Sequence, residues 1–406
     1  MQSNVVLEEA RELILSKVIP LPGELLTPVK ALGRILSADL RAPENLPRYP
    51  QAAVDGYAVH REDVGLTNVF TVRERLGSGE MPGGSLVSGE TAGVLTGGPV
   101  PGLTGAVVPQ ELAVTDGDRV IIKADIVEGL NIKLPGEDFG AGELLARRGD
   151  RVGPGLVGAL SAYGINEAPV YRSPRISILS LGSEVIPARL VPGPGQVRDC
   201  NGPLLASLST VDGGTVISLD TAGGEDYNCL KSRLKSLIQS SDLVITIGGT
   251  ASGACDCALR LIRESGGGVA FWGVKIKPGS HSGVAFCDSV PVISLSGNPA
   301  ACAVGYHLLA APVIRSFQGI DPFPGAFEAQ SLDAFPRKGG PRRFLRGYAH
   351  CSPGGWVVSL LPGQKSSMIR SLLGYNALVD LPAGHSPVDR GSRVTVIPVG
   401  LAVGKR

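Results

Sequence analysis

The stretch with the clearest chemical potential is the glycine-rich run IGGTASGACD, residues Ile247 to Asp256. It follows the apolar run Leu243 to Thr246, so we expect a strand that ends in a turn. Glycines let backbone N–H groups approach an anion closely. However, Ala254 and Cys255 stand where a phosphate-binding P-loop has lysine and Ser/Thr. The turn is therefore not a P-loop.

Glycines, hydroxyls, carboxylates and lysines also follow the other expected strands. These segments are Gly182-Ser-Glu184, Lys275-Ile-Lys277-Pro-Gly, Ser296-Gly-Asn298-Pro299 and, before a helical segment, Arg198-Asp199-Cys-Asn201. In an open α/β sheet, ligands bind beyond the carboxyl ends of the parallel strands. We therefore expect the strand-end segments to form one site.

The composition of these segments predicts the chemistry of their ligand. Glycine turns and a helix start at Pro299 leave backbone N–H groups free for an anion, and Lys277 adds a positive charge. Carboxylates at the same edge would repel the anion unless a cation lies between them, and Mg²⁺ is typically held by one or two carboxylates plus ligand phosphates. Glu184, Asp199 and Asp256 thus predict a phosphorylated ligand with Mg²⁺. Taken singly, each residue also has a structural interpretation: the glycines turn the chain, and Asp256 caps a helix or faces solvent.

Two further motifs do not support the functions they suggest. Gly153 to Gly158 has the spacing of a dinucleotide-binding loop, but it follows the charged run Arg147 to Arg151 and not a βαβ strand. Cys255-Asp-Cys257 lacks the second pair, or the histidine, that a zinc site needs. The seven cysteines form no Cys-x-x-Cys pair, so we expect reduced thiols in a cytoplasmic protein.

The charge and hydropathy patterns exclude two classes of partner. Lys and Arg exceed Asp and Glu by only one, 38 against 37, so no global field favours nucleic acid or anionic lipid. The sequence contains no run of 18 apolar residues, so we expect no membrane span. The N-terminal residues 5–18 have the spacing of an amphipathic helix and lack the basic flank of a signal peptide.

The expected fold is multidomain, of the α/β plus β class. Between residues 172 and 320, strands alternate with amphipathic segments such as Tyr227 to Ser240, which predicts a doubly wound parallel sheet. On both sides, short strands separated by glycine and proline clusters predict two small β domains. The expected boundaries are a discontinuous N-terminal helical domain at 1–42 and 142–171, a β module at 43–141, the α/β domain at 172–320, and a C-terminal β domain at 321–406.

Eight short motifs run along the chain in a fixed order. They are Ala53-Val-Asp55-Gly-Tyr-Ala-Val, Leu95-Thr96-Gly-Gly-Pro-Val-Pro101, Gly136-Glu-Asp138, Gly182-Ser-Glu184, Asp199-Cys-Asn201, Gly248 to Asp256, Lys277-Pro-Gly and Gly297-Asn-Pro299. Over the whole chain this pattern resembles the MoeA-type molybdopterin molybdenumtransferases, a family that also includes the gephyrin E domain. The resemblance implies that residues 172–320 form a Mog-like molybdopterin-binding domain.

The resemblance also implies an activity and its partners. An enzyme of this family inserts molybdenum from molybdate into adenylylated molybdopterin (molybdopterin-AMP), releases AMP and requires Mg²⁺. A cytoplasmic homodimer with a shared active site is implied, with the molybdopterin adenylyltransferase and molybdoenzyme apo-proteins as further partners. Two alternatives stay open: a non-catalytic molybdopterin-binding scaffold of the same fold, and a molybdopterin adenylyltransferase.

Particular residues carry these expectations. The expected catalytic residues are Asp55, Asp138, Glu184 and Asp256, and the expected metal ligands are Glu184, Asp199 and Asp256. The expected cofactor-binding residues are Thr96, Gly248, Gly249, Thr250, Ser252, Lys277, Gly297, Asn298, Pro299 and Ser371. The chain departs from the family pattern at Thr250-Ala-Ser252, Ser280, His281 and Ser296. At Ser280 the family has a lysine, so we expect weaker molybdate binding than in a lysine-bearing relative.

Overall fold

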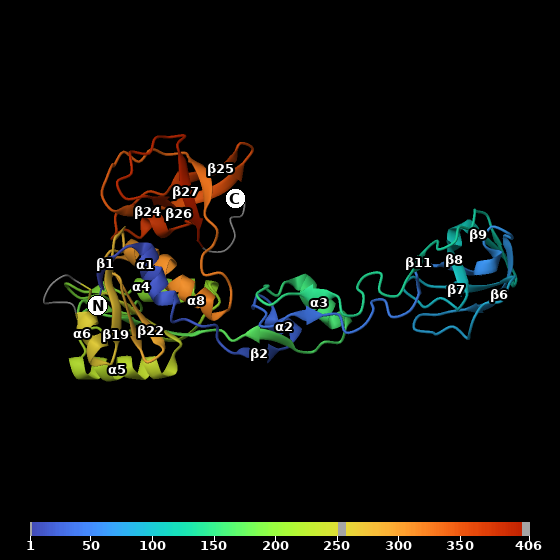
Figure 1. Ribbon diagram of the computed structural model, residues 1–406, viewed down its shortest axis with the longest axis horizontal. Helices are drawn as coiled ribbons and strands as arrows, with labels where there is room; N and C mark the ends of the chain where they lie inside the picture. Colours follow the sequence, from blue (N-terminus) through green and yellow to red (C-terminus); the bar gives the residue numbers. More distant parts are fainter. Residues whose placement is uncertain (1, 251–256, 400–406) are drawn as a thin grey trace. The chain divides into compact units, whose positions relative to one another are not determined.

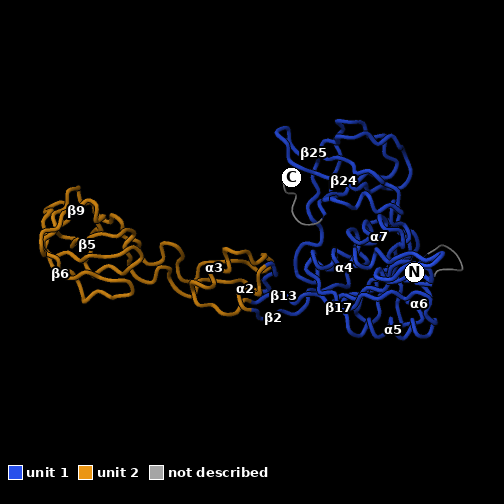
Figure 2. The backbone as a smooth tube through the Cα atoms, turned by 180° about the vertical axis from the view of Figure 1, so that it is seen from behind, with its two compact units in different colours: residues 1–26, 33–37, 169–406 blue, residues 27–32, 38–168 orange. Residues whose placement is uncertain are grey.

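Residues 2–250 and 257–399 are described by a computed structural model (Figure 1). The chain divides into two units (Figure 2). Unit 1 contains residues 1–26, 33–37 and 169–406, and unit 2 contains residues 27–32 and 38–168.

The centre of unit 1 is a seven-stranded sheet in the order β1-β19-β21-β22-β18-β14-β17. Its strands are β1 (Gln2–Val5), β14 (Arg175–Ser180), β17 (Thr215–Thr221), β18 (Leu243–Ile247), β19 (Gly268–Val274), β21 (Gly283–Cys287) and β22 (Val290–Leu295). All run in parallel except β21, which is antiparallel to both neighbours. The predicted doubly wound sheet is confirmed, with one antiparallel strand that the sequence pattern did not indicate.

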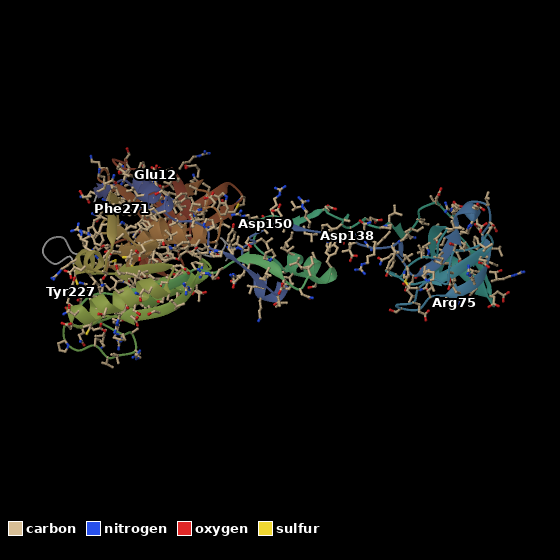
Figure 3. The ribbon with its side chains drawn as sticks, turned by 60° about the horizontal axis from the view of Figure 1, so that its bottom comes forward. Glu12, Arg75, Asp138, Asp150, Tyr227 and Phe271 are labelled. Carbon is tan, nitrogen blue, oxygen red and sulfur yellow. The ribbon has the colours of Figure 1, made fainter. Side chains whose placement is uncertain are left out.

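Helices cover both faces of this sheet. On one face lie α1 (Leu7–Leu15), α4 (Asn201–Val211), α7 (Pro299–Gly305), η3 (Tyr306–Ala310) and α8 (Ala311–Phe317); on the other lie α5 (Tyr227–Ser240) and α6 (Cys257–Glu264). Ile245 belongs to the first core and its neighbour Val244 to the second, because successive side chains of a strand point to opposite faces. Phe271 of β19 lies in the crowded interior of unit 1 (Figure 3).

One helical stretch, Pro299–Phe317, is long and apolar enough to cross a membrane by length and composition alone. It is 89% buried inside the protein, however, where it packs on the central sheet. Its apolar character is therefore explained by its place in the core.

The N-terminal segment packs differently from the expectation. β1 pairs in parallel with β19, and α1 joins the core of the same sheet, so residues 2–15 belong to unit 1, whereas residues 142–168 belong to unit 2. Leu7, Ala10 and Ile14 are the physical reason, because this buried stripe needs a large apolar surface to cover it. Of the segment 1–42, only residues 27–32 and 38–42 share unit 2 with α3 (Pro154–Ala162), against which α2 (Pro28–Ala31) packs.

The C-terminal part of unit 1 is a second sheet, in the order β20-β24-β25-β23-β27-β26, closed by a further β24–β26 pairing. Its strands are β20 (Ile276–Lys277), β23 (Phe327–Ser331), β24 (Arg342–Ser352), β25 (Gly355–Leu360), β26 (Ala377–Leu381) and β27 (Arg393–Pro398), with the short helix η4 (Arg370–Leu372). β20 reaches this sheet from within the α/β sequence, since Lys277 pairs with Arg343. The chain therefore contributes to the C-terminal sheet well before residue 321.

Unit 2 contains the other small β domain, a six-stranded sheet in the order β8-β5-β7-β6-β10-β9. Its strands are β5 (Gly56–His60), β6 (Val69–Arg75), β7 (Glu90–Val94), β8 (Thr104–Pro109), β9 (Ala113–Asp116) and β10 (Arg119–Ile122). Shorter pairings join β3 (Leu40–Arg41) to β12 (Leu144–Ala146) and β4 (Gln51–Ala52) to β11 (Ile132–Lys133). Alternate residues of β5 fill two small cores, with Tyr57 and Val59 in one and Ala58 in the other.

Candidate functional site

A cavity of about 1100 Å³ lies at the carboxyl ends of β14, β18 and β22. It is lined by the segments that follow these strands, Gly182–Val185, Gly248–Thr250 and Ser296–Pro299, and by Arg198–Asn201 at the start of α4. The structure thus brings together four of the segments that the strand-end pattern singled out.

The floor of the cavity depends on glycines. Gly248 and Gly249 have φ angles of 79° and 65°, a region that favours glycine. A Cβ on Gly248 would lie 2.6 Å from the carbonyl oxygen of Leu181, and a Cβ on Gly297 would lie 3.4 Å from the Gly248 Cα. The two neighbouring strand ends can approach this closely only because they carry no side chains. Gly248 is buried and its N–H donates to the Leu295 carbonyl at 2.9 Å, whereas Gly249 is half-buried and Gly297 is exposed, so these two present backbone to a ligand.

Glu184 provides a carboxylate without a partner. Its two carboxylate oxygens lie 2.9 and 3.0 Å from the point where a Cβ of Gly182 would stand, so the side chain folds back over this glycine at the cavity wall. Glu184 is exposed, and no donor among the described residues hydrogen-bonds its carboxylate. Its negative charge is therefore available to a cation.

Asp199 differs from Glu184 because it is buried and held in place. Its Oδ1 accepts a hydrogen bond from the Gly202 N–H at 2.9 Å, and its Oδ2 accepts one from the Thr221 hydroxyl at 3.1 Å. Asn201 next to it donates from Nδ2 to the Gly297 carbonyl at 2.7 Å, which ties the start of α4 to the loop after β22. Each Asp199 oxygen retains a lone pair for a further ligand.

These two carboxylates fit a magnesium site in part. Within residues 2–250 and 257–399, no three His, Cys, Asp or Glu side chains come together as a metal-binding group. Mg²⁺ usually needs only one or two carboxylates, since ligand phosphates and water complete its shell. Glu184 and Asp199 satisfy that requirement, whereas Asp256 and Ser252 lie outside the described residues.

Glu225 is a cavity residue that the sequence analysis missed. Its Oε1 lies 2.7 Å from Arg233 Nη2, while its Oε2 is buried without a hydrogen-bond partner in the described part of the chain. A buried acceptor with no donor is uncommon and costs free energy. The signal was present, because Gly223-Gly-Glu225 follows β17 and matches the pattern used for the other strand ends.

Two expected cofactor-binding residues do not line this cavity. Lys277 is exposed on β20, where it pairs with the C-terminal sheet. Ser371 is fully buried on η4, and its hydroxyl accepts hydrogen bonds from Arg346 Nε at 3.1 Å and Nη2 at 3.0 Å. Burial lowers the pKa of Arg346 to about 10. In the described residues no carboxylate forms an ion pair with Arg346, so the Ser371 hydroxyl helps to satisfy a buried cation.

A smaller cavity of about 310 Å³ adjoins the first. Cys200 and Pro299 line both, and Leu204, Ile369 and Leu372 are among the other walls of the small one. The segment before η4 is attached here, because the Ala300 N–H donates to the Ser366 carbonyl at 3.0 Å. The C-terminal sheet therefore contributes apolar surface next to the main cavity.

The remaining expected site residues lie in unit 2. Asp55 Oδ1 accepts two hydrogen bonds from Thr96, one from its N–H and one from its hydroxyl, each at 2.7 Å. These bonds, the backbone one first, hold the pKa of Asp55 below its usual value. Asp138 is exposed, and its N–H donates to the Leu46 carbonyl at 3.0 Å. Asp55 and Thr96 are thus brought together as a pair.

The pair gives a testable result. In a Thr96→Val variant the hydroxyl donor is lost and the N–H remains, so the pKa of Asp55 should rise toward the usual aspartate value. The pKa rises because the lost hydrogen bond favoured the charged carboxylate. Asp55 in the variant therefore takes up its proton at a higher pH. A carboxyl-detected NMR titration measures this change. Thr104→Val is the control, since that hydroxyl donates to Pro101; an Asp55 pKa that moves equally in both variants contradicts the assignment.

Three family models match the chain in succession. The MoeA N-terminal region (domain I and II) matches residues 5–164, a probable molybdopterin binding domain matches residues 177–316, and the MoeA C-terminal region (domain IV) matches residues 328–399. The first model covers the β domain of unit 2, the second covers most of the α/β domain, and the third covers the C-terminal β domain. The whole described fold is therefore accounted for by one family architecture.

Individual proteins agree with these matches. The chain is 27% identical over 402 residues to a molybdopterin molybdenumtransferase of Staphylococcus aureus, which covers 98% of this chain and 96% of that protein. It is 28% identical over 376 residues to the Staphylococcus epidermidis enzyme of that name, with 91% and 89% covered. The crystal structure of a molybdopterin biosynthesis moeA protein from Pyrococcus horikoshii superposes with a TM-score of 0.85 at 29% identity, covering 97% of this chain and 99% of that one.

The fold and the strand-end cavity, together with these matches, define a multidomain transferase with a Mog-like α/β domain. The chain belongs to the MoeA family of molybdopterin molybdenumtransferases. The resemblance of the eight motifs is confirmed over the length of the chain.

Proposed function

We propose that this transferase of molybdenum cofactor biosynthesis inserts molybdenum from molybdate into adenylylated molybdopterin and releases AMP, in a reaction that requires Mg²⁺. One observation carries the proposal: a single cavity is lined by the Glu184 carboxylate, which has no partner among the described residues, by the fixed Asp199 carboxylate, and by the backbone of Gly249 and Gly297. This combination suits an anionic phosphorylated ligand accompanied by a divalent cation. The names of the relatives support molybdopterin and molybdate as the substrates.

Each part of the cavity has a role in this reaction. The backbone of Gly249 and Gly297 binds the phosphates, and Glu184 and Asp199 hold Mg²⁺, with Asp256 as the third carboxylate expected from the sequence. When bound, Mg²⁺ offsets the charge that develops on the AMP leaving group. The free acceptor of Glu225 suits the N–H groups of the pterin ring. The chain thus acts by positioning and electrostatics, without a nucleophilic side chain.

We also propose that the working form is a homodimer with a shared active site. The expected catalytic residues are divided between the units, with Asp55 and Asp138 in unit 2 and Glu184 in unit 1. Asp55→Asn and Glu184→Gln chains, each inactive alone, should regain activity when mixed, because one site of a mixed dimer then has all its residues. Failure to regain activity in a mixture that forms mixed dimers argues against sharing.

The partners and location complete the proposal. The molybdopterin adenylyltransferase supplies the substrate, and molybdoenzyme apo-proteins receive the product. Five of the described cysteines are free thiols, namely Cys200, Cys229, Cys287, Cys302 and Cys351. Free thiols support a reducing compartment and hence a cytoplasmic location.

An AMP-release assay tests the activity directly. Purified protein is incubated with adenylylated molybdopterin, with and without molybdate and Mg²⁺, and AMP is separated by chromatography. The proposal expects AMP only when protein, Mg²⁺ and molybdate are all present. A scaffold would bind the substrate without releasing AMP, and an adenylyltransferase would instead consume ATP to form the adenylylated substrate. Either result would replace the proposed activity.

A further inference from the structure

The main cavity has an unusual charge balance for a site that binds anions. Among the described residues that line it, Glu184, Asp199 and Glu225 are acidic, whereas only Arg198 and His281 can carry a positive charge. A phosphorylated ligand therefore meets more negative than positive side chains. Each positive group then matters more to affinity than it would in a basic pocket.

The Arg198 side chain already makes a hydrogen bond within the protein. Its Nε donates to the Leu190 carbonyl at 2.9 Å, and Arg198 lies on the short strand β16 (Val197–Arg198), paired with β15 (Val185–Ile186). This contact holds the guanidinium toward the 187–196 segment. His281 is therefore the less constrained of the two groups.

The turn that carries His281 is fixed on both sides. The Val274 N–H donates to the Ser280 carbonyl at 3.0 Å, and the Gly273 N–H donates to the Ser282 carbonyl at 2.9 Å. Ser282 is fully buried, and its hydroxyl donates to the Gly279 carbonyl at 2.8 Å, while His281 between them is exposed. The backbone of the turn thus presents the imidazole at the cavity from an ordered position.

The imidazole itself has a free nitrogen. Its Nδ1 lies 3.4 Å from the Ser280 hydroxyl, and in the described part of the chain Nε2 has no hydrogen-bond partner and the ring has no ion pair. Histidine is the side chain whose charge normally changes between pH 5 and pH 8. A protonated ring at this position can donate a charge-assisted hydrogen bond to a phosphate.

We propose that His281 binds the phosphate of the cavity ligand when its ring is protonated, so that the affinity for phosphorylated ligands depends on pH. The inference rests on the proposed function, since it takes the ligand to be phosphorylated. The other titratable or charged described residues that line the cavity are Glu184, Arg198, Asp199, Cys200, Glu225 and Cys257, and Lys275 and Lys277 precede His281 on its own segment.

Binding of AMP to the full chain tests the inference. Isothermal titration calorimetry from pH 5.5 to pH 8.5 gives the dissociation constant for wild type, His281→Gln and His281→Lys. The ratio of the His281→Gln dissociation constant to that of wild type should be close to one at pH 8.5 and rise to about ten at pH 5.5. Comparing proteins at the same pH cancels the titration of the AMP phosphate. The Lys variant should bind at least as tightly as wild type at both ends, because its charge does not change.

His350→Gln is the matched control, since His350 lies on β24 and does not line the cavity. A ratio that is flat with pH, a control that behaves like His281→Gln, or no AMP binding at any pH would each overturn the inference. The AMP-release assay is independent of this result. The protein could fail to release AMP while the ratio of the His281→Gln and wild-type dissociation constants still rises at low pH. That result would refute the proposed function and leave His281 as a phosphate-binding residue.

Discussion

Replacing Glu184 by Gln should slow AMP release from adenylylated molybdopterin by about 10²–10³-fold, which is the effect of removing one well-placed electrostatic group from a transition state. The reason is the state of this side chain in the protein. Its carboxylate lines the cavity without any described hydrogen-bond donor, so its charge serves no structural contact. The amide keeps the size of the side chain and removes the charge that would hold Mg²⁺.

The binding data should separate this effect from a general loss of structure. AMP affinity in Glu184→Gln is expected to change little when Mg²⁺ is absent, while the Mg²⁺ concentration for half-maximal turnover rises. Glu12→Gln is the matched control, because Glu12, labelled in Figure 3, is exposed on α1 and does not line the cavity. Normal turnover of Glu184→Gln at limiting Mg²⁺ would contradict the assignment of Glu184 as a Mg²⁺ ligand.

The site could be predicted from the sequence wherever one local rule decided the position of a residue. Gly182, Gly248 and Gly297 each follow a short apolar strand, and parallel strands bring their carboxyl ends to one edge of the sheet. Glu184 followed from the same rule, and Asp199 from its place in a polar turn just before a helical segment. Glu225 obeys it as well, but β17 is an edge strand with alternating exposed and half-buried residues, which made its end less conspicuous.

Long-range pairing was not predictable from the sequence. The short strand β1 can be recognised only through its partner β19, and the buried stripe of α1 does not reveal which surface covers it. Lys277 was expected at the cavity because it follows β19 by a few residues, but pairing of β20 with β24 directs the chain into the C-terminal sheet. Nor does a local pattern indicate that Arg346, on another strand, uses the Ser371 hydroxyl. Contacts between distant residues decide these positions.

Replacing Glu225 by Gln should weaken binding of molybdopterin by about 10- to 100-fold, because a hydrogen bond to a charged group contributes about 1.5–3 kcal/mol. Glu225 lines the cavity, and one of its carboxylate oxygens is buried without a donor among the described residues; a pterin ring carries N–H groups that can supply one. Gln offers a single acceptor and an N–H₂ group that would face those donors. Fluorescence quenching under anaerobic conditions measures the pterin affinity, and AMP affinity in the same variant should stay close to wild type.

Two further variants distinguish ligand binding from the ion pair that Glu225 makes with Arg233. Glu264→Gln removes a carboxylate that pairs with Arg260 and Lys231 but does not line the cavity, so pterin affinity should be unchanged. Arg233→Met leaves the Glu225 carboxylate in place and should weaken binding much less than Glu225→Gln. Equal losses in Arg233→Met and Glu225→Gln would mean that the ion pair, and not the free oxygen, shapes the pocket. Because Glu225 and Gly249 line the same cavity from different strand ends, a selective loss of pterin affinity would also assign opposite ends of the ligand to these two residues.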